Sequence, residues 1–509
     1  MIMSELHCIA RSARSISLRL AVTGARYFLP APADWVLEKG GEPIASGHAT
    51  TAVLAIHDLR PDTEYHIAVT GFAPFKFRTA PCAGLIDIAD FGARQDAADN
   101  SSAIAAAIEA VPPGGTLRVS SGIWWTRPVF LKSDMTLELC AGAELRAVGA
   151  RGGWVKLPAH DEAGRMLGSW EGLPETCFAA LVTAIDAQNL VIAGPGTIDG
   201  GGDRGDWWSW PKETRDGARR PRTIHLIGCK NVTLLGPTIC NSPSWTVHPQ
   251  GCASLTATAL TIDNPTVSPN TDGLNPESCE GVLIEGVRFS VGDDCIAIKS
   301  GKRDMRGNGD HLAPTRDVTI RHCLMERGHG GVVLGSEMSG GIHDITVEDC
   351  EMRDTDRGLR VKTRRGRGGE VSTIRFRRVS MKGVYAAVTL NAFYFCDPDG
   401  HDEWVQSRCP AAVSDLTPQI RDIRIEDVQI ADLHLVAVAA LGLPEAPIRD
   451  ISIRNLAVSY AADAKPGPAL MAERVPDLRH AGIVAEWVQI DVDHSNITMT
   501  TESFEGAAQ

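Results

Sequence analysis

The chain has 509 residues and a formal net charge of −13, from 50 Lys and Arg against 63 Asp and Glu. This balance argues against nucleic acid as a ligand, and an acidic polymer would have to bind at a local positive groove because the molecule as a whole repels it. The 13 cysteines include no Cys-x-x-Cys pair, so the sequence indicates neither a complete disulfide framework nor a zinc site. A reducing compartment is favoured.

The first 26 residues contain no apolar run long enough for a signal peptide or a transmembrane helix, and Arg11, Arg14 and Arg19 are spread through them. We therefore predict a soluble protein without a membrane partner. The cytoplasm is favoured over a periplasmic or secreted location. Nothing in the sequence predicts an oligomeric partner.

Residues 1–83 predict a small β-sandwich, with strands at 16–20 and 35–37 and a further strand with its entry turn within 59–69. The run Leu-x-Pro-x-Thr-x-Tyr that ends at Tyr65 resembles the tyrosine corner of fibronectin type III domains, in which the Tyr hydroxyl bonds back to the turn backbone. This resemblance implies a structural or spacing module.

A boundary follows Pro81, and the main domain is predicted over residues 84–480. Near its start we expect a helix with Ser101 or Ser102 as N-cap, which could cover the open end of a stacked fold; its apolar face comprises Ile104, Ile108 and Val111. Residues 481–509 are predicted to form a tail that frays at its end, from Ser503 to Gln509.

Within the main domain a phrase of the form polar, apolar, x, apolar recurs. The first apolar residues of successive copies lie 23, 27, 36, 27 and 29 residues apart, at Val232, Leu255, Val282, Val318, Ile345 and Ile374. This is the period of a solenoid, whose units must stack because none can bury its own apolar face. Short strands without a recurring helix favour an all-β, right-handed parallel β-helix over a leucine-rich horseshoe. The alternative, an antiparallel sandwich, would need closer hairpin turns.

Cysteines at matching places in successive repeats predict buried ladders along the coil axis, Cys229 with Cys252 and Cys279, and Cys323 with Cys350.

Three acids fall about one coil apart, since 21 residues separate Asp272 from Asp293, with Asp294 alongside. Hydrolysis of a glycosidic bond with inversion needs a protonated carboxyl and a carboxylate that activates water, about 6.5–9.5 Å away. Repulsion within such a cluster raises the pKa of one member and keeps it protonated. Alone, the Asp293-Asp294 pair would be better explained as a capped turn or a Ca²⁺ site.

Four segments occur in order: Asn270-Thr271-Asp272-Gly273, Gly292-Asp293-Asp294-Cys295, Gly328-His329-Gly330 and Arg360-Val361-Lys362. They are similar to the active-site signatures of polygalacturonases, glycoside hydrolase family 28. Asp90-Phe91-Gly92-Ala93 and Pro112-Pro113-Gly114-Gly115 resemble the entry of pectin-degrading β-helix proteins, and the likeness covers residues 84–460. The resemblance implies a pectin lyase-like solenoid that cleaves α-1,4-galacturonosyl bonds of polygalacturonate or oligogalacturonides with inversion, without a cofactor or metal.

Carried over by position, the resemblance implies Asp293 as general acid and Asp272 with Asp294 as the pair that activates water. His329 would tune the protonation of Asp293 and help to bind substrate. Arg360 and Lys362, which alternate with Val361 and so share one side of a strand, would bind galacturonate carboxylates. Asn270 is a further predicted substrate contact. Three arginines downstream are considered as an extension of the positive surface, Arg364, Arg365 and Arg367.

Weaker evidence points to Trp245 and His248, one coil before Asp272, and to Tyr394 as further substrate contacts, with buried packing as the equal alternative for Trp245. Insertions around 151–175 and from Asn391 through Pro410 could close one end of the cleft, which favours cleavage from a chain end. The resemblance here is to the exo-acting branch.

Three rival functions remain open. A rhamnogalacturonan or other pectic-glycan hydrolase is the nearest competitor, and the complete set of His329, Arg360 and Lys362 argues against it. A Ca²⁺-dependent pectate lyase shares the β-helix but uses other motifs. A non-catalytic β-helix adhesin or sugar-binding protein would not need three acids beside His329.

Overall fold

The computed structural model describes residues 4–304, 306–493, 495–496 and 499–500. Its first part forms two antiparallel sheets, one of β1 (Leu6–Arg11), β2 (Ile16–Leu20) and β5 (Val53–Ile56), the other of β3 (Phe28–Lys39), β4 (Glu42–Thr51), β6 (Glu64–Val69) and β7 (Phe75–Arg78). Buried Tyr65 accepts a hydrogen bond at its Oη from the Arg60 backbone N–H, at 2.8 Å. This is the bond that the tyrosine-corner pattern predicts, whereas kinship with fibronectin type III domains stays a prediction.

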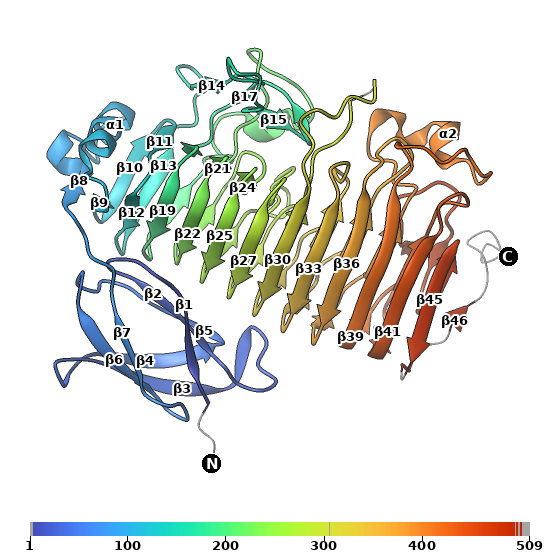
Figure 1. The fold of residues 1–509 in the computed structure, drawn as a ribbon, viewed down its shortest axis with the longest axis horizontal. Helices are drawn as coiled ribbons and strands as arrows, with labels where there is room; N and C mark the ends of the chain where they lie inside the picture. Colours follow the sequence, from blue (N-terminus) through green and yellow to red (C-terminus); the bar gives the residue numbers. More distant parts are fainter. Residues whose placement is uncertain (1–3, 305, 494, 497–498, 501–509) are drawn as a thin grey trace.

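The rest of the chain coils into a parallel β-helix, which confirms the predicted fold (Figure 1). Each apolar start predicted from the repeats pairs with the next in register, from Val232 opposite Leu255 to Ile345 opposite Ile374. The strands that carry them are β22 (Lys230–Leu235), β25 (Ala253–Thr258), β27 (Glu280–Glu285), β30 (Thr315–Arg321), β33 (Ile342–Glu348) and β36 (Glu370–Arg377), followed by β39 (Gln419–Leu433), β41 (Ile448–Tyr460) and β45 (Val488–Asp493).

The polar residue that opens each repeat bends the chain into its strand. It has a positive φ of 53° at Asn189, 54° at Asn231 and 59° at Asp344. Asn and Asp tolerate this left-handed conformation better than other residues with a Cβ, and Gly281, at 70°, takes the same place in its repeat. The bends also stack, since Asn231 Nδ2 donates to Asn189 Oδ1 at 2.7 Å.

The cysteine ladders form as predicted. The register of β22, β25 and β27 places Cys229, Cys252 and Cys279 one above another, and all three are buried free thiols. Cys323 and Cys350 are likewise buried, unbridged and aligned by the pairing of β31 (Leu324–Glu326) with β34 (Glu351–Arg353). These thiols fill the core as small apolar groups.

A second parallel sheet carries the functional face of the solenoid. Its first strands are β11 (Val129–Leu131), β18 (Val182–Ile185), β21 (Ile224–Ile227) and β24 (Val247–Gln250), and its later ones are β29 (Asp294–Ile298), β32 (Gly330–Gly335), β35 (Arg357–Lys362), β38 (Ala386–Asn391), β40 (Val436–Leu441), β44 (Ala481–Glu486) and β46 (Met499–Thr500). Isolated bridges from Val247 to Leu274 and from Leu274 to Ile296 join the two groups.

Helix α1 (Ser101–Ala110) covers the first coil, and Ile104, Ile108 and Val111 are buried as expected. Its N-cap is Asn100, not Ser101 or Ser102. The Asn100 side chain ties the preceding loop instead, accepting from Arg94 N at 2.8 Å and donating to the Trp125 carbonyl at 3.0 Å.

At the other end, the coils continue past residue 480, where the sequence places a tail. β44 pairs with β40, and β45 pairs with β41. A long loop between β41 and β44 increases the sequence separation of this last coil from the one before it. The repeat spacing therefore does not predict it. The predicted fraying of Ser503 to Gln509 lies outside the described residues.

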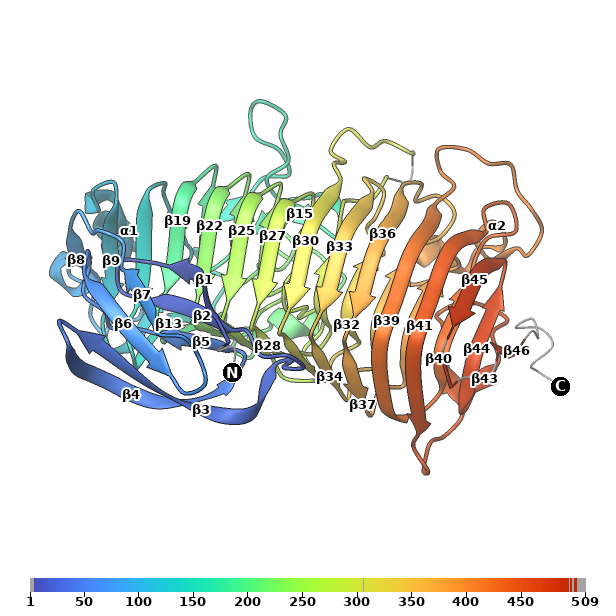
Figure 2. The same cartoon turned by 60° about the horizontal axis from the view of Figure 1, so that its bottom comes forward.

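Two groups of loops cover the functional sheet. The first group comprises residues 151–181, with the hairpin of β15 (Ser169–Trp170) and β16 (Leu173–Pro174), together with residues 200–223, and the second comprises residues 395–418, with α2 (Glu403–Gln406). Figure 1 shows these loops above the solenoid and the N-terminal sheets below it, and Figure 2 brings the latter forward. The N-terminal sheets dock through Arg19 on buried Glu285 at 3.3 Å and through His322 Nδ1 on the Arg26 carbonyl at 2.8 Å.

None of the described helices is both long and apolar enough to cross a membrane.

Candidate active site

Three carboxylates meet on the outer face of the functional sheet. Asp272 lies in the loop after β26 (Thr261–Asp263), Asp293 immediately precedes β29, and Asp294 is the first residue of β29. One oxygen of each lies within 4.8 Å of the other two. This is closer than the roughly 6.5–9.5 Å expected of an inverting pair, because parallel coils are stacked only about 4.8 Å apart.

The three acids differ because their surroundings differ. Burial and the charge of Asp293 raise the pKa of Asp272 well above its usual range. Burial acts in the same direction on Asp293, but the hydrogen bond and charge of His329 outweigh it and lower the pKa of Asp293 to about 2. The raised pKa therefore belongs to Asp272, and not to Asp293, the acid that the resemblance implies.

His329 lies beside Asp293, one coil further on. Its Nδ1 is 3.4 Å from Asp293 Oδ1, and its side chain is 56% exposed. The hydrogen bond and the charge of Asp293 raise the pKa of His329 to about 9. The imidazole is therefore a cation at neutral pH, and a ligand can reach it.

Arg360 and Lys362 project from β35 toward the acids, as the alternation predicts. Lys362 Nζ donates to Asp294 Oδ2 at 2.7 Å, and Arg360 Nη1 lies 3.8 Å from Asp294 Oδ1. The ring of Tyr394 lies 5.5 Å from Lys362 Nζ and 5.7 Å from Arg360 Cζ, measured from its centroid. Tyr394 and Lys362 line the same cavity as the three acids.

Trp245 and Asn270, both predicted to contact substrate, also line this cavity. Arg220 Nη2 donates to Asn270 Oδ1 at 2.6 Å and fixes it. Lys299 Nζ lies 5.2 Å from the centroid of the Trp245 ring, so the indole supports a cation of the cavity wall.

His248 does not reach the cavity, and the prediction that it faces the sugar is wrong for this structure. Its side chain is fully buried, with Nε2 2.8 Å from Glu277 Oε2 and its ring stacked on His225. The register does put His248 on the outer face of β24. The loop of residues 151–181, however, covers that face, where Ser169 Oγ donates to Gln250 Oε1 at 3.1 Å.

The three arginines after Lys362 do not extend the positive surface as considered. Arg364 and Arg367 are buried and pair with Asp397, and Arg365 is buried and pairs with Glu445 through Nε at 2.6 Å. Their charges hold the 395–418 loop to the solenoid.

Other residues of the cavity escaped the sequence reasoning. Glu171, Lys212, Lys299, Glu337 and Asp397 all line it. Lys299 is one residue beyond β29, at the position whose equivalents in later coils are Gly335 and Lys362. Following the position of Lys362 back through two coils of the repeat would have identified Lys299. The others lie on loops, which carry no such periodicity.

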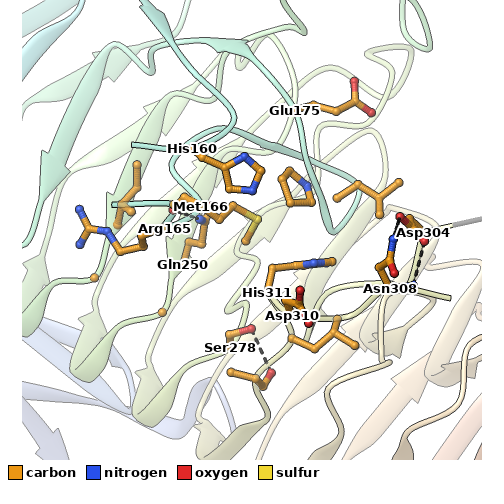
Figure 3. Close-up of a pocket in the computed structure, with 18 residues that line it drawn as sticks. His160, Arg165, Met166, Glu175, Gln250, Ser278, Asp304, Asn308, Asp310 and His311 are labelled. Carbon is orange, nitrogen blue, oxygen red and sulfur yellow. Dashed lines mark hydrogen bonds between the residues drawn. The ribbon is translucent and has the colours of Figure 1, made fainter. Parts of the chain in front are cut away.

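The hairpin β15–β16 walls the cavity on its N-terminal side. Its tip, Glu171–Gly172, bonds to the catalytic coil through the Gly172 carbonyl, which accepts from Lys302 N at 3.0 Å, and Glu171 pairs with Lys212 at 2.7 Å. Behind the hairpin lies a separate cavity of about 870 Å³, lined by Leu173 and His311 among others (Figure 3). It contains none of the catalytic candidates.

A loop from the last coil covers the C-terminal side. Met471 Sδ lies 3.1 Å from Arg360 Nη2, and the Met471 carbonyl accepts from Asn391 Nδ2 at 3.0 Å. Arg357 donates to the Pro468 and Ala469 carbonyls, each at 3.0 Å. The middle of the sheet is therefore covered on both sides of the acids.

Among the described residues, Asp272, Asp293 and Asp294 form a group whose spacing would also suit a metal ion. The surroundings do not favour one. Lys362 and His329 bring positive charge to two of these carboxylates, at 2.7 Å from Asp294 Oδ2 and 3.4 Å from Asp293 Oδ1. A divalent cation would have to displace or repel these groups.

Comparison with known proteins agrees with this geometry. The chain matches Glycosyl hydrolases family 28 over residues 162–465. It is 34% identical over 357 residues, 70% of this chain and 69% of that protein, to a protein named probable polygalacturonase from Vitis vinifera.

Two solved structures are similar. A hyperthermoactive exopolygalacturonase from Thermotoga maritima superposes with a TM-score of 0.66 and 26% identity over 83% of this chain and 93% of that one. A family 28 exopolygalacturonase from Yersinia enterocolitica gives 0.68 and 20% over 98% and 97%, which supports the fold. The chain belongs to glycosyl hydrolases family 28 and is a glycoside hydrolase of the polygalacturonase type.

Proposed function

We propose that the protein removes sugars from the ends of α-1,4-linked galacturonate chains by hydrolysis with inversion. The observation that carries this is the cavity itself, which is lined by the three acids and Lys362 and also by Glu171 at the hairpin tip. A wall beside the acids leaves room for a chain end rather than for a continuing chain. The exo-acting name of the Thermotoga maritima neighbour supports the same reading.

In this proposal Asp293 protonates the leaving oxygen, and Asp272 with Asp294 orients and activates water. The proton must then pass from Asp272 to Asp293, whose oxygens are within 4.8 Å. In this proposal the arrival of a galacturonate carboxylate causes that proton transfer. Placed beside exposed His329, it offsets the imidazolium charge that holds down the pKa of Asp293.

The state of the carboxylates supports inversion in this proposal, although their short spacing would suit retention. A retaining enzyme needs a carboxylate that is available as a nucleophile. Asp294 is held by Lys362 at 2.7 Å, and Asp272 Oδ2 accepts a hydrogen bond from Asn275 Nδ2 at 2.8 Å, so both carboxylates are weakened as nucleophiles. A water molecule held by both carboxylates is the better nucleophile.

The cations serve the substrate carboxylates. Lys362 and Arg360 lie next to Asp294, and Lys212 stands at the hairpin wall with 56% of its side chain exposed. Each galacturonate unit carries a carboxylate, so a subsite must present fixed positive charge. This requirement fits galacturonan better than the mixed backbone of rhamnogalacturonan.

The His329–Asp293 pair predicts a pH dependence of stability. The pKa of His329 is raised from 6.5 to about 9, so its contribution is complete below pH 6.5 and lost as the pH rises through about 9. The pKa of Asp293 is lowered from 3.8, so its contribution is complete above that pH. Between pH 3.8 and pH 6.5 both contributions are complete. In this range we expect His329→Gln to lower Tm by about 1–2 °C, since exposed pairs contribute under ~1 kcal/mol.

Thermal unfolding of both proteins between pH 4 and 10 measures this difference. It should fade above about pH 9, where the wild-type imidazole is neutral. A difference that is the same at every pH would show that the pair is not charged as described.

The products formed from polygalacturonate, with and without chelator, test the function. Saturated mono- or digalacturonate from the earliest times, unaffected by chelator, is the expected result. A ladder of sizes would mean internal cleavage. Unsaturated product lost with chelator would indicate a Ca²⁺-dependent lyase, and no product would turn attention to another pectic glycan or to a binding role.

A further inference from the structure

The residues that immediately precede the strands of the functional sheet include an aromatic side chain, Tyr385, that has no role in the proposed function. Pairing of Asp294 with Gly330, Val332 with Leu359 and Arg357 with Ala386 fixes the register of four successive coils. The residues just before these strands therefore stack in one line, as Asp293, His329, Asp356 and Tyr385. Their first two members already touch, at 3.4 Å.

This line stays accessible where the middle of the sheet does not. The His329 side chain is 56% exposed, and Tyr385 as a residue is 47% exposed. In the same coils Arg360 is 11% exposed beneath Met471, and Asn391 is buried against the same residue. A substrate chain that runs from the acids toward the C-terminal coils therefore meets the Met471 loop if it follows the middle of the sheet. It does not meet that loop if it follows the line from Asp293 to Tyr385.

Tyr385 has the properties of a sugar platform. An exposed aromatic ring presents a flat apolar face that suits the C–H face of a pyranose, while its hydroxyl remains polar. His434 packs edge-on against the ring, with centroids 5.1 Å apart and planes at 69°, and so restricts its rotation. Three coils separate Tyr385 from Asp293, which is roughly 14 Å at the usual strand spacing.

The charges along the line suit an acidic sugar in one orientation. Asp356 can accept hydrogen bonds from sugar hydroxyls and repels carboxylates. On the covered side of the line, Arg357 and Arg360 present two guanidinium charges, with Arg360 Nη1 3.8 Å from Asp294. Carboxylates would turn toward the arginines, and the sugar faces toward Tyr385.

We propose that Asp356 and Tyr385 extend the active site into a subsite for a galacturonate unit a few sugars away from the cleaved bond, with Tyr385 as its stacking platform. This subsite rests on the proposed function. It makes the enzyme favour longer chains, although the hairpin wall confines cleavage to a chain end.

The test is kcat/KM on oligogalacturonides from the dimer to the hexamer, for wild type, Tyr385→Ala and Tyr385→Phe. We expect Tyr385→Ala to lose about 3–10-fold on the hexamer, to keep wild-type values on the dimer, and to be largely rescued by Tyr385→Phe. Phe91→Ala is the matched control, since Phe91 is an exposed aromatic, 37% accessible, at the N-terminal end of the solenoid.

A loss that is equal for every chain length, or no loss, would overturn the subsite. Calorimetric binding of hexagalacturonate to Asp293→Asn protein, with and without Tyr385→Ala, separates the two proposals. If the wild type cleaves nothing but binds the hexamer through Tyr385, the subsite stands and the proposed function fails. If it neither cleaves nor binds, both fail.

Discussion

Replacing Asp293 by Asn is expected to lower kcat on oligogalacturonides by about 10²–10⁴-fold, the usual contribution of a general acid. The amide cannot give a proton to the leaving oxygen. The fold should tolerate the change, because the Asp293 side chain is 22% exposed and the hydrogen bond from the His329 backbone N–H to the Asp293 carbonyl remains. Steady-state kinetics, with a melting curve to check folding, measure the effect.

The choice of leaving group separates the acid from the base. An aryl galacturonide with an acidic phenol needs little protonation, so Asp293→Asn should keep most of its activity on that substrate. Asp272→Asn should lose both activities, because water is no longer activated. If Asp272→Asn were instead the variant rescued by the aryl substrate, the two roles would be exchanged, in keeping with the raised pKa of Asp272.

Replacing Lys299 by Met is expected to destabilise the protein by about 3–5 kcal/mol, the usual cost of removing one partner from a buried pair. Lys299 Nζ lies 2.5 Å from Glu337 Oε2, with the two side chains 5% and 7% exposed. Burial alone would raise the pKa of Glu337, and the charge of Lys299 outweighs it and lowers that pKa. Without Lys299, an unpaired carboxylate is left beside the acids.

Chemical denaturation measures this loss, and two variants control it. Lys299→Met with Glu337→Gln should recover most of the stability, since neither charge of this buried pair remains. Lys212→Met breaks a more exposed pair, 56% and 20% accessible, and should cost less than about 1 kcal/mol. Equal costs for Lys212→Met and Lys299→Met would contradict the account of the buried pair.

The fold was predictable because its signal is local and repeated. Each phrase combines a bend residue that tolerates positive φ, such as Asn231, with alternating apolar side chains, such as Val232 and Leu234. The spacing of the phrases then gave the register directly, including Val282 opposite Val318 across the longest gap. The last coil was missed because a loop, residues 461–480, separates it from β41.

The candidate site was predictable where its residues lie on coils. Asp272, Asp293 and Asp294 are brought together by one turn of the solenoid, and Lys362 by alternation within β35. His248 obeys the same alternation, yet the insertion buries it, and no periodicity shows which loop folds over which coil. Glu171 was missed for that reason, since a hairpin tip reaches the acids through contacts that are distant in sequence.

The most direct test of end-wise inverting hydrolysis is proton NMR of an oligogalacturonide during the first turnovers. The anomeric proton of newly released sugar should appear first in the β configuration, because an α-linkage is inverted, and a single short product should accumulate. An α-anomer would mean retention, as the short spacing of the carboxylates alone would suggest. A vinylic proton, or fragments of many sizes, would contradict end-wise hydrolysis itself.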